Sequence, residues 1–131
     1  MKFVFCLVVV VVLPSAAFSA TIYVPDDQPT IQDAINAAVS GVDVVIVRSG
    51  TYVENIDFIG KAITVQSESG PETTTIDGGS TFSVVYFNSG EGLDSVLDGF
   101  TITNGLARSG GWFDDSGAGI WCVGSSPTIR N

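Results

Sequence analysis

The sequence contains no histidine, few cations and few cysteines. Without histidine, neither a Ser-His-Asp nor a Cys-His nucleophile system nor a His-rich zinc site can form within these residues. Of the two cysteines, Cys6 lies in a leading segment that we expect to be removed, so Cys122 has no partner in this chain for a disulfide framework. Five Lys and Arg residues stand against fourteen Asp and Glu, and a net charge of −9 repels phosphate backbones and anionic lipid. Nucleic acid and membrane surfaces are therefore not expected as partners, and a polyanionic substrate needs an intervening cation.

The first residues are typical of a secretory signal. Lys2 precedes an unbroken apolar run over residues 3–13, which is too short to span a bilayer. Ala17 and Ser19 then supply the small-x-small pattern that signal peptidase accepts. We therefore predict a signal peptide over residues 1–19, cut after Ser19 or one residue later. The expected product is a secreted, extracellular protein that keeps no membrane span once the signal is removed.

Residues 20–42 predict one strand followed by a single capping helix. A short β-branched segment over residues 21–24 is stopped by a Pro-Asp-Asp turn. Thr30 is a good N-cap, and Gly41 supplies a C-terminal stop. Between them the apolar residues fall at helical spacing: Ile31, Ala34, Ile35, Ala38 and Val39. The result is a short amphipathic helix with one apolar face, suited to act as a lid.

From residue 43 onward the pattern changes to brief β-rich segments separated by Gly, Asn, Asp and Ser. These segments lie at 44–47, 52–58, 62–67, 74–77, 83–88, 96–104, 119–123 and 127–130. An all-β chain of this kind is a sandwich or a solenoid, and internal similarity decides between them. Residues 58–64 align with residues 97–103, which favours stacked coils. Because a coil cannot bury its inward residues alone, the first coil needs a cover, and the helix precedes it.

Several motifs carry a resemblance to a known family. The N-terminal half looks like the start of secreted right-handed parallel β-helix proteins of the pectin lyase-like superfamily, and it is similar to pectin methylesterases at that end. The later repeats are similar to those of secreted bacterial β-helix proteins of unassigned function. The motifs are PTIQDAINAA (29–38), VVIV (44–47), GTYVENI (50–56), KAITV (61–65), TIDG (75–78), LDGFTITNG (97–105), GAGIWC (117–122) and SSPTIRN (125–131).

The resemblance implies an all-β, right-handed parallel β-helix with one N-terminal capping α-helix. Residues 43–131 are then the first coils, truncated at the C-terminal end. It implies a carbohydrate-associated protein, acting as a polysaccharide lyase, pectin esterase or glycoside hydrolase, with its active groove outside this chain. The alternative is a non-catalytic extracellular or cell-surface β-helix, anchored through a missing C-terminal region, that binds glycans or other partners. We also expect self-association through the open end.

The loop over residues 110–117 is longer and more aromatic than a coil turn requires. Asp114 and Asp115 are candidate Ca²⁺ ligands, and Trp112 is a candidate face for a sugar ring in a polysaccharide. Two adjacent acids fall well short of a full calcium ligand set, so the alternative is a solvated insertion whose aromatic residues pack over the coil. The family's catalytic residues match no positions here, so the catalytic residues stay unknown.

Other polar residues have structural interpretations. Asp-Gly is a turn signature, so Asp77 and Asp98 are expected in turns rather than as catalytic acids. Bends are expected to use the amides of Asn55, Asn88 and Asn104 to satisfy backbone groups. We expect Cys122 to pack as a small hydrophobe within the stack. The cations Arg48, Lys61, Arg108 and Arg130 are expected as solvated surface charge.

Overall fold

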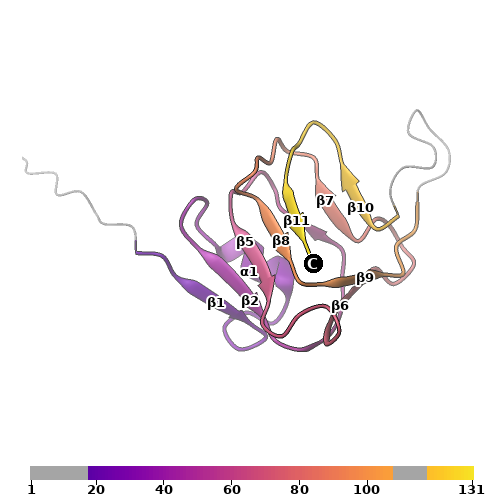
Figure 1. Ribbon diagram of the computed structural model, residues 1–131, viewed down its shortest axis with the longest axis horizontal. Helices are drawn as coiled ribbons and strands as arrows, with labels where there is room; N and C mark the ends of the chain where they lie inside the picture. The colour runs from indigo at the N-terminus through magenta and orange to yellow at the C-terminus, as the bar shows by residue number, and fades with distance from the viewer. Residues whose placement is uncertain (1–17, 108–117) are drawn as a thin grey trace, which may run out of the picture.

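The computed structural model describes residues 18–107 and 118–131 (Figure 1). These residues form strands and one short helix, which confirms the predicted all-β class. No helix in these two ranges is long and apolar enough to cross a membrane. The elements in chain order are β1 (Thr21–Val24), α1 (Ile31–Ala37), β2 (Val44–Val47), β3 (Gly50–Val53), β4 (Ile56–Asp57), β5 (Thr64–Ser67), β6 (Thr74–Asp77), β7 (Val85–Phe87), β8 (Val96–Asp98), β9 (Thr101–Thr103), β10 (Ile120–Cys122) and β11 (Thr128–Arg130).

The strands form three sheets in which every pair of neighbours is parallel. Sheet A has the order β1-β2-β5-β8-β11, sheet B the order β3-β6-β9, and sheet C the order β4-β7-β10. Figure 1 shows the five strands of sheet A side by side. From β2 onward the chain visits sheets A, B and C in turn, three times over, and then returns to sheet A. From β2 onward, consecutive strands therefore do not pair with each other, and β1 with β2 is the one consecutive pair among the described strands.

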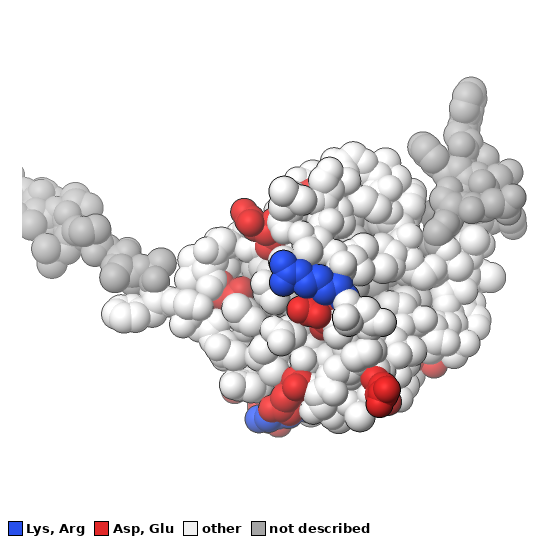
Figure 2. Space-filling view, viewed as in Figure 1, with Lys and Arg blue, Asp and Glu red and all other residues white. Residues whose placement is uncertain are grey.

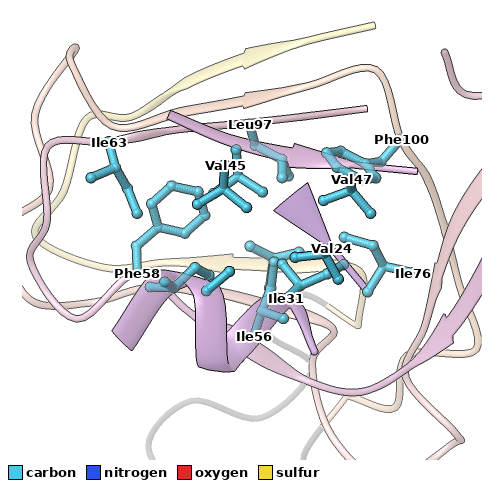
Figure 3. Packing of buried hydrophobic residues seen from close by; sticks show 14 of the residues in the cluster. Val24, Ile31, Val45, Val47, Ile56, Phe58, Ile63, Ile76, Leu97 and Phe100 are labelled. Atoms are coloured by element: carbon cyan, nitrogen blue, oxygen red, sulfur yellow. The ribbon is translucent and has the colours of Figure 1, made fainter. Parts of the chain in front are cut away.

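Alternation along each strand decides which side chains enter the core. Val45 pairs in register with Val65, and Val65 with Leu97, so these aliphatic side chains stack on one face of sheet A. Ile76 of sheet B and Phe87 of sheet C point into the same core, and all five are at most 2% exposed. Figure 3 shows side chains from all three sheets meeting those of the helix. One apolar core thus lies between the sheets.

The helix covers the beginning of this core. Thr30 caps it as predicted, with its hydroxyl accepting the Asp33 N–H at 3.0 Å. Ile31 and Ile35 are fully buried, and α1 packs against β1, β2 and β4. The helix ends at Ala37, earlier than its apolar spacing predicts, so Val39 is 57% exposed rather than buried.

Two charged side chains from the first layer bind the ends of α1, and the Gln32 amide of the helix bonds back to that layer. The Glu54 carboxylate accepts the N–H groups of Ile31 and Gln32, at 3.0 and 2.9 Å. The Lys61 ammonium donates to the last carbonyls of the helix, those of Ile35, Asn36 and Ala38, at 2.7–2.8 Å. Gln32 exchanges two hydrogen bonds with the backbone of Asp57, so its amide continues sheet C in place of a strand. The Glu54 and Lys61 contacts satisfy helix-end groups that otherwise have no partner.

Two corners require glycine. A Cβ on Gly105 would lie 1.7 Å from the Ala118 carbonyl oxygen, so only glycine fits where two corners touch. Gly99 has φ +77°, which confirms the turn predicted at Asp98-Gly99. Because of such corners, the predicted segments 52–58 and 96–104 each divide into two strands in different sheets.

The alignment of residues 58–64 with residues 97–103 predicted that the two segments occupy equivalent places in stacked coils, and this was wrong. Leu97 lies in sheet A, whereas Phe58 follows the end of β4 in sheet C. Thr64 begins β5 of sheet A, whereas Thr103 ends β9 of sheet B. The two segments share apolar-Gly-apolar spacing because both turn a corner, but the corners are different.

Candidate functional site

The strongest predicted site residues fall outside the described part of the chain. Trp112, Asp114 and Asp115 lie within residues 108–117, as does Arg108. Their roles as sugar platform and Ca²⁺ ligands stay predictions. Among the described residues, no group of three or more acidic or cysteine side chains is placed to hold a metal ion.

A shallow groove lies on the outer face of sheet A. It measures about 340 Å³, and its floor is built by Val44, Thr64 and Val96, which occupy one register column of β2, β5 and β8. The turn Gly41–Asp43 and the exposed Asp94 form its walls. Such an open groove with a mixed floor suits a ligand with both C–H faces and hydroxyl groups.

Asp43 in the wall is held by the fold. Its Oδ2 accepts the Val39 N–H at 2.8 Å, and its Oδ1 accepts the Ala20 N–H at 2.9 Å. These two backbone donors keep the pKa of Asp43 below its usual range, with a smaller contribution from the charge of Lys61. Asp43 is therefore a fixed carboxylate at neutral pH, and only Asp94 offers a free carboxylate to the groove within the described residues.

Of the described cations, Arg48 and Lys61 are engaged within the fold, whereas Arg130 is exposed as predicted. Arg48 donates to Asp26 at 2.8 Å, binds Glu68 and lies 4.7 Å from the centre of the Tyr23 ring. The prediction that Lys61 is solvated surface charge was wrong, because its ammonium caps α1. In Figure 2 the blue cations visible on this face each lie beside red carboxylates. No cation cluster for an acidic polysaccharide forms in this part of the chain.

Asp77 and Asn55 bond backbone groups at bends as predicted, whereas the amides of Asn88 and Asn104 bond side chains instead. Asp77 Oδ1 accepts the Gly79 N–H at 2.8 Å, and its other oxygen accepts the Asn104 amide at 2.8 Å. Asn55 donates to the Ser83 carbonyl oxygen at 2.9 Å, which joins one corner to the next. These contacts occupy both carboxylate oxygens of Asp77 and give the two side chains structural roles at the corners.

Sequence reasoning missed Glu91, a nearly buried carboxylate that ties three layers together. It is 2% exposed and accepts hydrogen bonds from the Gly60 N–H at 2.8 Å, the Ser89 N–H at 2.9 Å and the Ser125 hydroxyl at 2.7 Å. Burial by itself raises the pKa of Glu91, but the hydroxyl and backbone donors outweigh it and leave the pKa lowered. Only the flanking glycine and serine residues hint at such a turn.

The outer face of sheet C carries an aromatic pair that was also missed. Tyr86 of β7 and Trp121 of β10 stand in register, with ring centroids 5.5 Å apart at an interplanar angle of 71°. Both are half-buried, and neither belongs to the core, which their neighbours Val85 and Phe87 enter instead. Asp57 of β4 continues the same outward column. The signal was available, because alternation in VYF and IWC places the central aromatic residue outward.

Cys122 differs from its expected place in a packed stack. It occupies the inward position beside Phe87, but it is exposed and donates its thiol to the Ser125 carbonyl oxygen at 3.3 Å. β10 is an edge strand, so no further strand packs over this position in the described residues.

No buried side-chain nitrogen or oxygen in the described ranges lacks a hydrogen-bond partner. The described interior therefore offers no unpaired polar group to a ligand, and the candidate ligand-binding residues lie on the outer faces. Comparison with protein-family models, curated proteins and solved structures found no match to this chain.

Proposed function

We propose that the chain builds the first coils of a right-handed parallel β-helix, closed at its near end by α1. The cyclic visit to three all-parallel sheets supports this proposal, because each turn through sheets A, B and C adds one layer in register. The inward columns of aliphatic residues are the packing that stacked coils require.

We propose further that this is a secreted protein that binds glycans through its outer faces. The observation that carries the proposal is the Tyr86–Trp121 pair, held on the rigid outer face of sheet C. Aromatic rings offer apolar faces against which the C–H groups of a pyranose pack, while Asp57 beside them can accept hydroxyl hydrogen bonds. Two side chains supply far less area than the roughly 800 Å² per partner of a stable protein interface, which favours a small ligand unit over a protein.

The described residues support binding rather than catalysis. A lyase, esterase or hydrolase needs an acid-base pair or a base beside a cation. Here the carboxylates of Glu54, Asp43 and Glu91 are occupied by backbone donors, and Lys61 is occupied by helix carbonyls. No observation in this part of the chain favours the enzymatic alternative that the family resemblance implies.

The test uses the secreted chain with Trp112→Phe, which leaves Trp121 as the one remaining tryptophan. We expect cellohexaose or xylohexaose to change the Trp121 fluorescence saturably, and we expect Tyr86→Ser to weaken that binding about fivefold, as loss of about 1 kcal/mol of ring contact predicts. Tyr23→Ser, which removes an outward aromatic residue from sheet A, is the matched control and should leave affinity unchanged.

Three further arms separate the alternatives. Loss of binding on Trp112→Phe alone would move the site to the loop at residues 110–117. Loss of glycan binding in the Thr64→Arg variant, but not in the matched Thr75→Arg variant of sheet B, would place the binding site in the groove instead. Incubation with polygalacturonate and Ca²⁺, or with methylated pectin, tests for unsaturated product and for methanol. If no glycan is bound and neither product forms, the proposal fails.

We also propose that the far end, formed by the edge strands β9, β10 and β11, supports self-association. Ile129 in the inward column is 50% exposed there, and the backbone groups along three strand edges lack a strand partner in the described residues. Sizing of the secreted protein over a range of concentrations tests this, and a concentration-independent monomer would contradict it.

A further inference from the structure

Ala20, which directly precedes β1, makes two hydrogen bonds to the segment before β2. The Ala20 nitrogen donates to Asp43 Oδ1 at 2.9 Å, and the Ala20 carbonyl oxygen accepts the Val44 N–H at 3.0 Å. Strand β1 begins at the next residue. Ala20 thus fastens the first strand of sheet A to the segment that joins α1 to β2.

The predicted signal cleavage changes the chemistry of that nitrogen. Hydrolysis of the Ser19–Ala20 amide by signal peptidase consumes one water, leaves a carboxylate on Ser19 of the released segment, and leaves an amine on Ala20. Because an α-amino group has a pKa of about 8, this amine is an ammonium at neutral pH. It retains the donor that Asp43 accepts and adds a positive charge opposite a carboxylate.

We propose that cleavage after Ser19 creates an ion pair between the Ala20 ammonium and Asp43, which locks the start of β1 onto the segment between α1 and β2. The inference rests on the proposed secretion and is independent of glycan binding. It also selects between the two cleavage positions. A cut one residue later removes Ala20, and with it the two hydrogen bonds that precede the β1–β2 ladder.

The surroundings of Asp43 favour such a pair. Asp43 is 7% exposed, and its second carboxylate oxygen is held by the Val39 N–H, so its position is fixed before the ammonium forms. Charge-assisted hydrogen bonds at such distances are stronger than neutral ones. The other charged groups nearby are Lys61, whose charge acts on Asp43, and Asp94 across the groove.

A pH dependence follows with a defined sign. An ammonium that gains a partner on folding has a folded pKa above its unfolded value of about 8. Its stabilisation is therefore complete below about pH 8 and is lost as the pH rises through the folded pKa. An amide nitrogen at the same place has no such titration.

The experiment begins with the full precursor expressed in a secreting host and with mass spectrometry of the product, where Ala20 is the expected first residue. A matched chain that begins one residue earlier, at Ser19, keeps the Ala20 N–H as a donor but displaces the charge by one residue. We expect NMR titration to place the α-amino pKa above about 8 in the Ala20 chain and at its ordinary value in the Ser19 chain. Asp43→Asn should abolish this difference.

Separate results overturn separate steps. A product that begins at Thr21, or an uncut precursor, overturns the cleavage site. A product that begins at Ala20 with the same α-amino pKa as the Ser19 chain overturns the ion pair and leaves secretion standing. Urea unfolding between pH 7 and pH 10 provides a second readout. Equal pH dependence for the Ala20 and Ser19 chains would contradict the lock even where Asp43→Asn fails to fold.

Discussion

The two ends of the strand stack are built differently. At the near end, α1 buries Ile31 and Ile35 against the first strands, and Glu54 and Lys61 satisfy its terminal backbone groups. At the far end, the inward residue Ile129 is half exposed and Cys122 is exposed, although both occupy the same register columns as buried residues. Burial in this fold therefore depends on the layer above and below, and not on the strand pattern alone.

The largest effect is expected within the stack. Leu97 is 2% exposed and lies between Val65 and Ile129, so Leu97→Ala removes a side chain with packed layers on both sides. We expect a loss of about 2–5 kcal/mol in the free energy of unfolding, because a cavity remains. Urea unfolding measures it. A loss of stability no larger than that of Ile129→Ala would contradict the claim that interior residues contribute more than residues at the far end.

At the near end, Lys61→Met should lower the free energy of unfolding by about 1–3 kcal/mol, because it leaves the carbonyls of Ile35, Asn36 and Ala38 without their donor. The exposed Arg130 offers a matched control, and Arg130→Met should stay within about 0.5 kcal/mol. Equal effects of the two substitutions would mean that the helix docks through its apolar face alone.

Glu91 links the inner layers to the far end, because its carboxylate accepts the Ser125 hydroxyl. The pH dependence of stability therefore measures the strength of this link. Because the folded pKa is lowered from its ordinary value of 4.5, the stabilisation is present above that value and is lost as pH falls through the folded pKa. Glu91→Gln should therefore lose less stability between pH 6 and about pH 3 than the unmodified protein. The exposed Glu72→Gln is the control, and urea midpoints are the measurement.

The smallest effect is expected at the far end. Ile129→Ala removes a side chain that is already 50% exposed, so we expect a loss of about 1 kcal/mol or less. Ile129→Lys should additionally weaken self-association in sizing experiments, because a charge then occupies the apolar edge. Unchanged association of that variant would place the contact elsewhere.

Local patterns predicted the elements better than their ends. Alternating β-branched residues gave β2 and β6 with the boundaries that the structure has, and Thr30 gave the start of α1. The end of α1 was wrong, because Asp43 and Lys61 take the N–H and carbonyl groups with which another turn would form. Both partners come from later segments, so helical spacing carries no trace of them.

The candidate site was predicted less well, for the same reason. Alternation offered an unused signal that Tyr86 and Trp121 point outward, but only the pairing of β7 with β10 brings the two rings together. The role of Glu91 was harder still to predict, because its partners Gly60 and Ser125 each lie more than thirty positions away in sequence. A pattern within one strand carries no information about which layer will lie beside it.

The parallel layering of non-consecutive strands is tested most directly by interstrand NOEs at β5. We predict that Val65 shows backbone contacts with both Val45 on β2 and Leu97 on β8, in parallel register. Contacts of β5 with its sequence neighbour β6 in antiparallel register would contradict the layered arrangement, and with it the shared core and the Tyr86–Trp121 pair.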